Sequence, residues 1–383
     1  MVRIAIVGGG IGGLTAALAL REFGFESEVY EQAPALLDVG AAIALWPNAL
    51  RVLERLGLKT TILGHAGEMS EIRWLDQRGA LLNRVSIPQS VALHRADLQS
   101  TLFHALAPHV IKLGHTFAAY DDRKDNVVAS FTQGEEIETD VLIGADGIHS
   151  KIRAQILKDN QPIYRGYTVW RGISSVLPDS IPANTAVEIH GRGKRFGIGP
   201  VGNGRAGWWA AANLTWTLSA AASERAAHNA HDELLRLFKG WPSSALQLIE
   251  STPPERILTT PAFDRDPNQT WGNGRITLLG DAIHPTTPNL GQGGCLAMED
   301  ALVLARCFAK YGATEEALRK YEGCRYQRTA AITKYSRFYG NMGQWENPLA
   351  RGCKTFFLSL TPESVLQRLM QTVFDYDANT VTV

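Results

Sequence analysis

The first part of the chain alternates short apolar runs with a longer pattern at helical spacing. An apolar run at residues 2–7 leads into glycines, and apolar positions at helical spacing follow from Leu14 to Phe23. A second apolar run ends at Glu31. Strands that alternate with helices in this order predict a mainly parallel sheet with helices on its faces. We therefore expect an α/β unit through about residue 60.

Beyond this region the pattern changes to short, β-prone runs bounded by turn residues. Such runs lie at residues 72–75, 127–131, 186–189, 196–199 and 207–211. We expect a second, largely antiparallel sheet at about residues 165–265, inserted into the first unit. The chain then returns with an apolar run at residues 275–279, a loop, and a helix at about residues 294–310.

The C-terminal segment from Phe356 to Phe374 carries apolar residues at helical spacing. Packing of this helix against the body of the protein is the favoured interpretation. A lid, a contact between subunits, and transient contact with a membrane that holds a lipophilic substrate are the alternatives. The sequence leaves its role open.

Composition and charge narrow the class of protein. The 383 residues exceed one ordinary hydrophobic core, so two domains are expected. The 38 basic residues equal the 38 acidic ones, which offers no overall field for a nucleic acid or an anionic membrane. The four cysteines lack Cys-x-x-Cys spacing and suggest neither a metal site nor a redox pair.

These features lead us to expect a soluble, cytoplasmic protein. The N-terminal apolar run is broken by glycine after Val7, so we do not expect it to act as a signal peptide. The sequence has no run of about 20 apolar residues, the length that a membrane span needs. Stable membrane insertion is not expected, and a monomer and a homodimer both remain open.

The glycines at residues 8–13 have the spacing of a dinucleotide-binding turn. Gly8 permits a tight turn, Gly10 lets the backbone approach a pyrophosphate, and Gly13 lets the helix lie close to the strand. The N-terminus of that helix faces the phosphate charge. Glu31 follows at the distance typical of a carboxylate that binds ribose hydroxyls. This motif alone does not distinguish FAD from NAD.

Two later segments repeat the order of strand, turn and helix. Asp146-Gly147 follows an apolar run at residues 140–145 and precedes a helix start. Gly280-Asp281 follows the run at residues 275–279 and precedes a loop rich in proline and glycine. Three such motifs in this order are more specific than a glycine turn alone.

With these motifs, nearly the whole chain resembles the single-component FAD-dependent aromatic hydroxylases, among them the p-hydroxybenzoate, salicylate and 6-hydroxynicotinate hydroxylases. Zeaxanthin epoxidase and the bacterial FAD-dependent urate hydroxylase are relatives. The resemblance implies that NADH or NADPH reduces a bound FAD, that dioxygen forms a flavin C4a-hydroperoxide, and that one oxygen atom passes to a small aromatic or heteroaromatic substrate. The expected fold is α/β: a Rossmann-like FAD-binding domain with an inserted, mainly antiparallel β-sheet substrate domain and C-terminal helices.

The resemblance also assigns residues to domains and to the cofactor. The FAD-binding domain is expected at residues 1–70, 95–165 and 266–325, the substrate domain at 71–94 and 166–265, and a C-terminal helical segment at 326–383. A helix that begins near residue 293 would direct backbone N–H groups at the negative charge of a reduced flavin. The residues matched to the flavin site are Gly8, Gly10, Gly12, Gly13, Glu31, Ala44, Arg95, Asp146, Asp281, Gly291, Gln292, Gly293, Gly294 and Cys295.

On the substrate side the resemblance points to Arg205, Pro288 and Gly291 as catalytic residues. Arg205 follows a Gly-Asn-Gly turn, where its planar guanidinium would hold an anionic or carbonyl-rich substrate. Pro288 and Gly291 lie in the loop that would form a stiff wall beside the peroxide. Ala44 stands where the 6-hydroxynicotinate hydroxylase pattern has a histidine, so the site needs another polar anchor.

Aromatic and histidine residues are weaker candidates for this site. Tryptophans could line an apolar pocket, although aromatic residues in a sheet more often belong to a core. His149 and His284 could act as acids or bases, and a loop histidine with one hydrogen bond is the simpler interpretation. The tryptophans considered are Trp170, Trp208, Trp209 and Trp216.

Three other functions stay open at this point. An epoxidase of an isoprenoid-like alkene would use the same oxygen chemistry. An FAD-dependent reductase of prenyl chains shares the first two motifs and needs no oxygen. A non-enzymatic, flavin-bound interaction protein would bind FAD without turnover.

Overall fold

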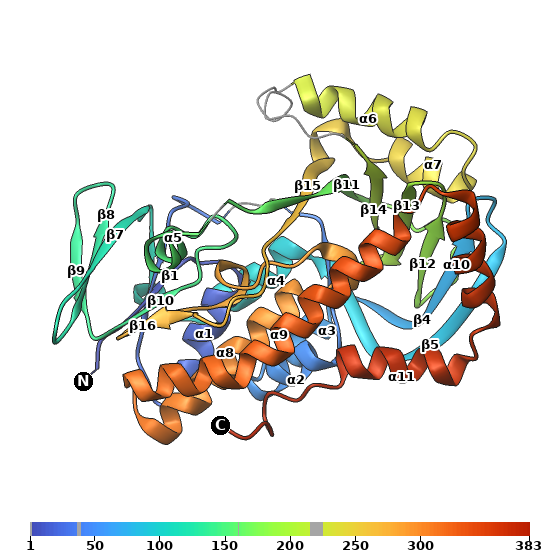
Figure 1. Ribbon diagram of the computed structural model, residues 1–383. Helices are drawn as coiled ribbons and strands as arrows, with labels where there is room; N and C mark the ends of the chain where they lie inside the picture. The colour runs from blue at the N-terminus through green and yellow to red at the C-terminus, as the bar shows by residue number, and fades with distance from the viewer. Residues whose placement is uncertain (1, 37–39, 160, 215–224) are drawn as a thin grey trace.

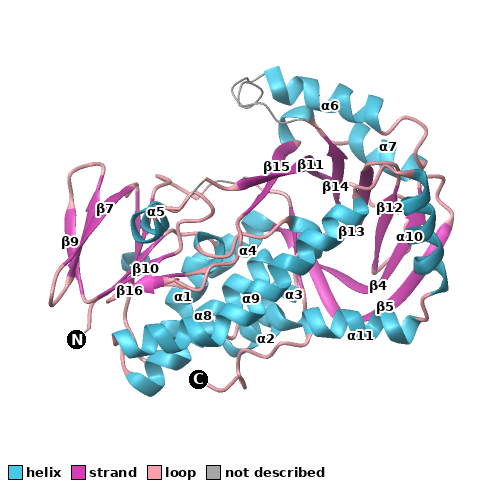
Figure 2. Cartoon of the chain, in the orientation of Figure 1, coloured by secondary structure: helices cyan, strands magenta, loops and turns pink. Residues whose placement is uncertain are grey.

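The computed structural model describes residues 2–36, 40–159, 161–214 and 225–383. Helices and strands are both abundant, which confirms the mixed α/β fold (Figure 2). The helices are α1 (Ile11–Glu22), α2 (Pro47–Arg55), α3 (Lys59–Leu63), α4 (Arg95–His104), α5 (Lys151–Leu157), α6 (Arg225–Leu237), α7 (Ser243–Glu250), α8 (Gly293–Tyr311), α9 (Glu315–Gly343), α10 (Pro348–Leu360) and α11 (Glu363–Phe374). The long helix α9 runs from the N-terminal sheet toward a second large sheet (Figure 1).

The first sheet is the one that the glycine pattern predicts. Its strand order is β16-β17-β10-β1-β2-β6, and all neighbours are parallel except β16 and β17. Because the carboxyl ends of parallel strands share one edge, the turns after β1, β10 and β17 and the end of β2 meet there. The strands are β1 (Ile4–Val7), β2 (Glu28–Glu31), β6 (Ile111–Leu113), β10 (Val141–Gly144), β16 (Gly272–Asn273) and β17 (Ile276–Leu278).

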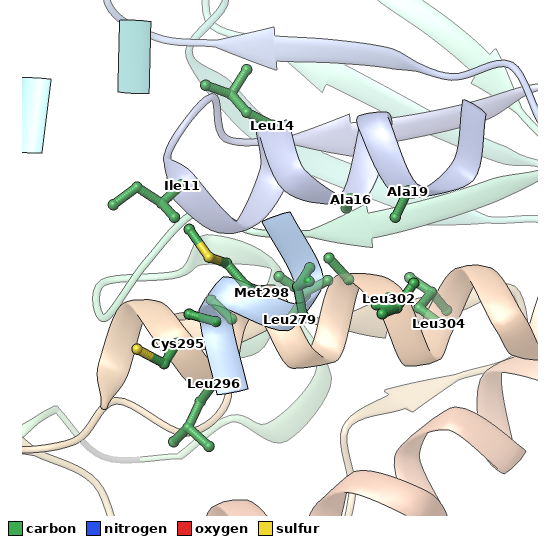
Figure 3. Packing of buried hydrophobic residues seen from close by; sticks show 14 of the residues in the cluster. Ile11, Leu14, Ala16, Ala19, Leu279, Cys295, Leu296, Met298, Leu302 and Leu304 are labelled. Atoms are coloured by element: carbon green, nitrogen blue, oxygen red, sulfur yellow. The ribbon is translucent and has the colours of Figure 1, made fainter. Parts of the chain in front are cut away.

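Helices α1 and α8 pack against each other beside this sheet. Figure 3 shows the small side chains Ala16 and Ala19 of α1 directed toward α8. Gly12 belongs to the same contact, because a Cβ there would lie 3.2 Å from Ala297 Cβ of α8. The helix expected at about residues 294–310 is therefore confirmed, and its close contact with α1 depends on small residues.

The second sheet is largely antiparallel, as expected, but it draws on more of the chain. Its order is β15-β11-β14-β13-β12-β4-β5-β3, and only β12 and β4 are parallel neighbours. Three of its strands precede residue 95. Strand β3, which the sequence places in the FAD-binding domain, pairs with β5 because its backbone groups need partners. The strands are β3 (Ala42–Leu45), β4 (Gly67–Asp76), β5 (Leu81–His94), β11 (Ile163–Ser174), β12 (Thr185–His190), β13 (Lys194–Pro200), β14 (Ala206–Asn213) and β15 (Leu258–Asp264).

A third, three-stranded sheet contains β7 (Phe117–Asp122), β8 (Val127–Phe131) and β9 (Glu136–Thr139). The β-prone run at residues 127–131 is thus a strand, and it lies outside the second sheet. The division of the chain into domains stays a prediction.

The C-terminal segment forms two helices in place of the single one expected. The break falls at Thr361-Pro362, because a residue that precedes proline disfavours helical backbone. Helix α11 packs against β5 and buries Leu366, Val373 and Phe374. In the described part of the chain, no helix is long and apolar enough to cross a membrane.

Candidate active site

The glycine turn after β1 is shaped by the backbone around it. A Cβ on Gly8, whose φ is +111°, would lie 2.3 Å from Ala145 O, and a Cβ on Gly13 would lie 1.9 Å from Gly8 O. A Cβ on Gly10 would meet nothing within 4 Å. Gly8 and Gly13 are therefore required by the protein's own packing, whereas Gly10 faces open space at the N-terminus of α1, where a phosphate fits.

Glu31 lies at the end of β2 and binds the glycine turn. Its Oε2 accepts a hydrogen bond from the backbone N–H of Gly9 at 2.6 Å, and Oε1 accepts one from Ala33 at 2.8 Å. Gln99 of α4 donates to Gly9 O at 2.9 Å. The exposed Arg95 begins α4, one helical turn before Gln99. No sequence motif indicates Gln99, although its spacing from Arg95 places both residues on one helix face.

Asp146 combines helix capping with an unused oxygen. Its Oδ2 accepts a hydrogen bond from the backbone N–H of Lys151 at 2.9 Å. The other oxygen, Oδ1, is buried without a hydrogen-bond partner among the described residues. Burial raises the pKa of Asp146. A buried polar atom without a partner is costly, so a ligand hydroxyl beside the glycine turn would satisfy it.

The Gly280-Asp281 turn forms a short helix, η4 (Gly280–Ala282), and is held from behind by a buried ion network. Asp300 Oδ2 accepts from the N–H of Gly280 at 3.0 Å and lies 2.5 Å from His284 Nε2. Arg325 Nε donates to Asp300 Oδ1 at 2.7 Å. Burial alone would raise the pKa of Asp300, but the facing charges of His284 and Arg325 hold it below its ordinary value. His284 is therefore a buried support residue, and Asp281 is left exposed to the site.

Asp300 and Arg325 belong to no motif that the sequence predicts for this site. The available signal was an acidic pair in the middle of an otherwise apolar helical run, which requires buried partners when the helix is covered on all sides. The partner comes from α9, and its identity is not encoded near the motif.

The loop between η4 and α8 forms one wall of the site. It contains a second short helix, η5 (Pro288–Leu290), and then Gly291, whose φ is +61°. Helix α8 begins at Gly293, and both Gly293 and Gly294 line the cavity described below, as do Pro288 and Gly291. The predicted helix N-terminus is therefore present, with its first N–H groups at the cavity wall.

Gln292 and Cys295 support this loop from the protein side. Gln292 is buried, and its Oε1 accepts from Asn48 Nδ2 at 2.8 Å. Cys295 is fully buried, with Sγ 3.7 Å from Ala44 O, and burial raises the pKa of its thiol to about 12. Neither side chain is among the described residues that line the cavity, whereas Ala44 is.

A cavity of about 990 Å³ lies between this loop and the second sheet. The flavin-motif side contributes Asp281, Gly291 and Gly293, and the sheet and the C-terminal helices provide the opposite wall. The lining is mostly apolar, with a few charged side chains, as in sites for small organic molecules.

Arg195 is the best-placed arginine of this cavity for contact with the loop. It projects from β13, and its Nη2 donates to Asn289 Oδ1 at 2.5 Å while Nη1 donates to Glu188 Oε1 at 3.1 Å. Its guanidinium carbon lies 5.2 Å from the ring centre of Trp209. Asn289 belongs to the loop between η4 and α8, which we call the flavin-side loop. Arg195 therefore links the second sheet to that loop.

Arg205, for which the sequence predicts this role, lies in the turn that precedes β14. It is not among the described residues that line the cavity. Its guanidinium forms an ion pair with Asp97 of α4 at 3.5 Å and a weak hydrogen bond with Gly202 O. The contact of Arg205 with a substrate stays a prediction: Arg205 lies in the turn between β13 and β14, whereas Arg195 lies within β13 and lines the cavity.

The aromatic candidates divide between cavity and core. Trp209 lines the cavity, and Trp170 belongs to the core of the second sheet. Trp208 does both: it lines the cavity and is a buried member of the same core cluster as Trp170. His149 also lines the cavity. Trp216 falls outside the described residues.

A charged cluster that the sequence did not indicate extends from Arg195 along the cavity wall. Glu188 Oε2 accepts from the hydroxyl of Tyr339 at 2.8 Å, and Lys354 Nζ of α10 lies 3.2 Å from His190 Nδ1. Burial lowers the pKa of His190 to about 4 and that of Lys354 to about 8. Burial alone would raise the pKa of Glu188, but the facing positive charges, that of His190 when it is protonated and that of Arg195 at every pH, hold it below its ordinary value. Glu188 is thus ionised and His190 neutral at neutral pH.

Comparison with known proteins identifies similar sequences over most of the chain. A family model described as an FAD binding domain matches residues 1–336. The chain is 38% identical to the aurachin C monooxygenase/isomerase of Stigmatella aurantiaca, over 91% of each chain. It is 32% identical to the FAD-dependent urate hydroxylase of Klebsiella oxytoca, over 88% of this chain and 89% of that one.

A solved structure shows the same architecture. The Klebsiella pneumoniae protein HpxO, in complex with FAD and uric acid, superimposes with a TM-score of 0.91 at 28% sequence identity. The match covers 97% of this chain and 96% of that chain.

Proposed function

The chain belongs to the FAD-binding family that contains the FAD-dependent aromatic monooxygenases, and we propose that it hydroxylates a small aromatic or heteroaromatic compound, with NADH or NADPH and dioxygen as co-substrates. The observation that carries this proposal is the continuity of one cavity from the flavin-side loop to Arg195. A cytoplasmic location, and a monomer or homodimer, are part of the same proposal.

The residues at the sheet edge fit an FAD molecule. Gly10 offers open space at a helix N-terminus, Asp146 Oδ1 lacks a partner among the described residues, and Asp281 is exposed beside them. These groups match a pyrophosphate and the hydroxyls of a ribityl chain. On binding, Glu31 would give up the hydrogen bond that it accepts from Gly9 and accept one from a ribose hydroxyl. Bound FAD, once reduced by NADH or NADPH, supplies the activation of dioxygen.

The loop and the first turn of α8 would stabilise negative charge on the cofactor. The N–H groups of Gly293 and Gly294 begin a 19-residue helix. A helix N-terminus in partly buried geometry contributes up to about 2 kcal/mol to the binding of an anion. Pro285 and Pro288 both line the cavity, and neither has an N–H group, so this wall is stiff and offers the substrate few competing donors.

Arg195 would hold the polar edge of the substrate. Three of its N–H groups donate to Asn289, Glu188 and, at 3.4 Å, Gln344, which fixes the plane of the guanidinium, and Trp209 covers one face. The remaining N–H groups suit a ring hydroxyl, a carbonyl or an anionic ring nitrogen. Apolar walls around it exclude water, which strengthens such a hydrogen bond.

The decisive experiment follows oxygen into the product. Purified protein should release FAD on acid treatment, and an aromatic compound that accelerates NADH or NADPH oxidation should acquire one atom from isotopically labelled dioxygen. Label that enters from water, or equal product formation without oxygen, would contradict the monooxygenase and favour a reductase. FAD binding without turnover of any aromatic compound would favour the interaction protein.

A further inference from the structure

Helix α11 connects the flavin-side loop to the outer surface. At its start, Glu363 Oε1 accepts from the backbone N–H of Ser86, in the middle of β5, at 2.8 Å. At its end, Phe374 stacks on Trp46 with ring centres 4.2 Å apart. Trp46 Nε1 would lie 3.0 Å from a Cβ on Gly291. The helix therefore runs from the second sheet's outer part to the flavin-side loop.

One face of α11 forms a continuous apolar wall of the cavity. The helix is 12 residues long, and residues of this face recur at helical spacing from Leu366 to Phe374, which corresponds to about 12 Å along the axis. Trp74 of β4 and Leu358 of α10 also line this part of the cavity. We call this part the apolar arm. Its wall of α11 is formed by Leu366, Leu369, Met370, Val373 and Phe374.

The apolar arm reaches the surface through exposed apolar side chains. Phe357 of α10 is 68% exposed and Leu369 of α11 is 49% exposed, yet both line the cavity. Phe356 and Leu360 of α10 are exposed nearby along the same helix. An apolar molecule that enters here would cover surface that otherwise faces water, which is favourable in proportion to the area.

We propose that the substrate carries a lipophilic chain, which lies in the apolar arm while the aromatic ring lies between Arg195 and the flavin-side loop. This inference rests on the proposed function, because it assigns the ring to the oxygenation site. The 990 Å³ includes the space beside Gly291 and Gly293 that a flavin ring would occupy, and one further aromatic ring beside Arg195 leaves the apolar arm unfilled. Water is a poor occupant, since apolar cavities offer it no hydrogen bonds. The charged pyrophosphate of a nicotinamide dinucleotide is equally unsuited to this lining.

The expected effect of chain length is large. Burial of one methylene strengthens binding by about fourfold. The four methylenes that separate an ethyl from a hexyl chain should therefore improve affinity by at least about tenfold, even when only half of them are buried.

The test is equilibrium dialysis of FAD-loaded protein with resorcinol, 4-ethylresorcinol and 4-hexylresorcinol, in the absence of NADH and NADPH. Met370→Trp fills the arm from inside, and Leu369→Trp fills it at the half-exposed rim, where folding is little affected. Leu349→Trp is the matched control, because Leu349 is 80% exposed on α10 and is not among the described residues that line the cavity. Thermal unfolding verifies that each variant is folded.

We expect the hexyl compound to bind at least tenfold more tightly than the ethyl compound in the wild type and in Leu349→Trp. In the two arm variants this ratio should fall toward one, while resorcinol binds as before. Affinity that is independent of chain length, failure of the hexyl compound to bind, or an unchanged ratio in both arm variants overturns the proposal. Failure of the proposed function would appear separately, as absent oxygen transfer with the chain-length ratio intact.

Discussion

The two sides of the cavity are built in different ways. The flavin side is made mainly of backbone: glycines whose Cβ atoms would collide with neighbouring carbonyls, and N–H groups at the ends of helices α1 and α8. The substrate side is made of side chains from β4, β12, β13 and the three C-terminal helices. The first side binds groups that every FAD molecule has, and the second side decides which ring and which chain can enter.

This difference predicts different responses to substitution. A site made of backbone is disrupted when a Cβ atom is added to one of its glycines, because close contacts between main-chain atoms cannot relax. A wall of apolar side chains tolerates exchanges that conserve volume and polarity. Charged groups in that wall are less tolerant, because each is buried against a partner.

The largest effect is expected from valine in the glycine turn. Gly13→Val should destabilise the fold by more than about 4 kcal/mol, since even its Cβ would lie 1.9 Å from Gly8 O. Gly10→Val should fold normally, because a Cβ there meets no protein atom within 4 Å, and should lose FAD. Thermal unfolding and the flavin absorbance of the purified variants measure the two outcomes. A stable Gly13→Val protein, or full FAD content in Gly10→Val, would show that backbone contacts do not define this side.

The next effect separates the two arginines. Arg195→Ala should lower kcat/KM by about 10- to 150-fold, the loss of a charge-assisted hydrogen bond of about 1.5–3 kcal/mol. Arg195→Lys should recover part of it, since lysine keeps the charge beside Glu188 and lacks the planar fork. Arg205→Ala should keep kcat/KM within about twofold of the wild type, because Arg205 lies in the turn before β14 and its guanidinium pairs with Asp97.

Steady-state kinetics on the identified substrate provide the measurement, and FAD content should be equal in all three variants. A large loss of kcat/KM in Arg205→Ala, with none in Arg195→Ala, would show that Arg205 and not Arg195 binds the substrate.

The smallest effect concerns pH. The pKa of His190 falls from 6.5 to about 4 on folding because the side chain is buried. As the pH falls from 7 to 5, His190 becomes protonated in the unfolded chain and stays neutral in the folded protein. The free energy of unfolding therefore decreases. His190→Asn should remove about 1–2 kcal/mol of this loss. The exposed His109→Asn is the control, and urea unfolding at pH 7 and pH 5 is the measurement. Equal pH dependence in the wild type and His190→Asn would show that His190 is not held neutral.

Much of the flavin side could be predicted from the sequence. The glycine turn, Glu31, the Gly280-Asp281 turn and the start of α8 all lie where the patterns placed them. The parallel sheet explains why segments more than 100 residues apart converge, because the carboxyl ends of its strands share one edge. The ion pair of Asp300 and Arg325 behind the turn could not be predicted, because Asp300 lies on α8 and Arg325 on α9.

The sequence by itself determined the backbone of the cofactor side, because a tight turn, a positive φ and a helix start depend on residues that are neighbours along the chain. Only the tertiary structure decided that Arg195 lines the cavity, that β3 joins the second sheet, and that α11 forms the wall of the apolar arm. Each of these depends on which elements cover a given face, and packing between distant segments sets that choice.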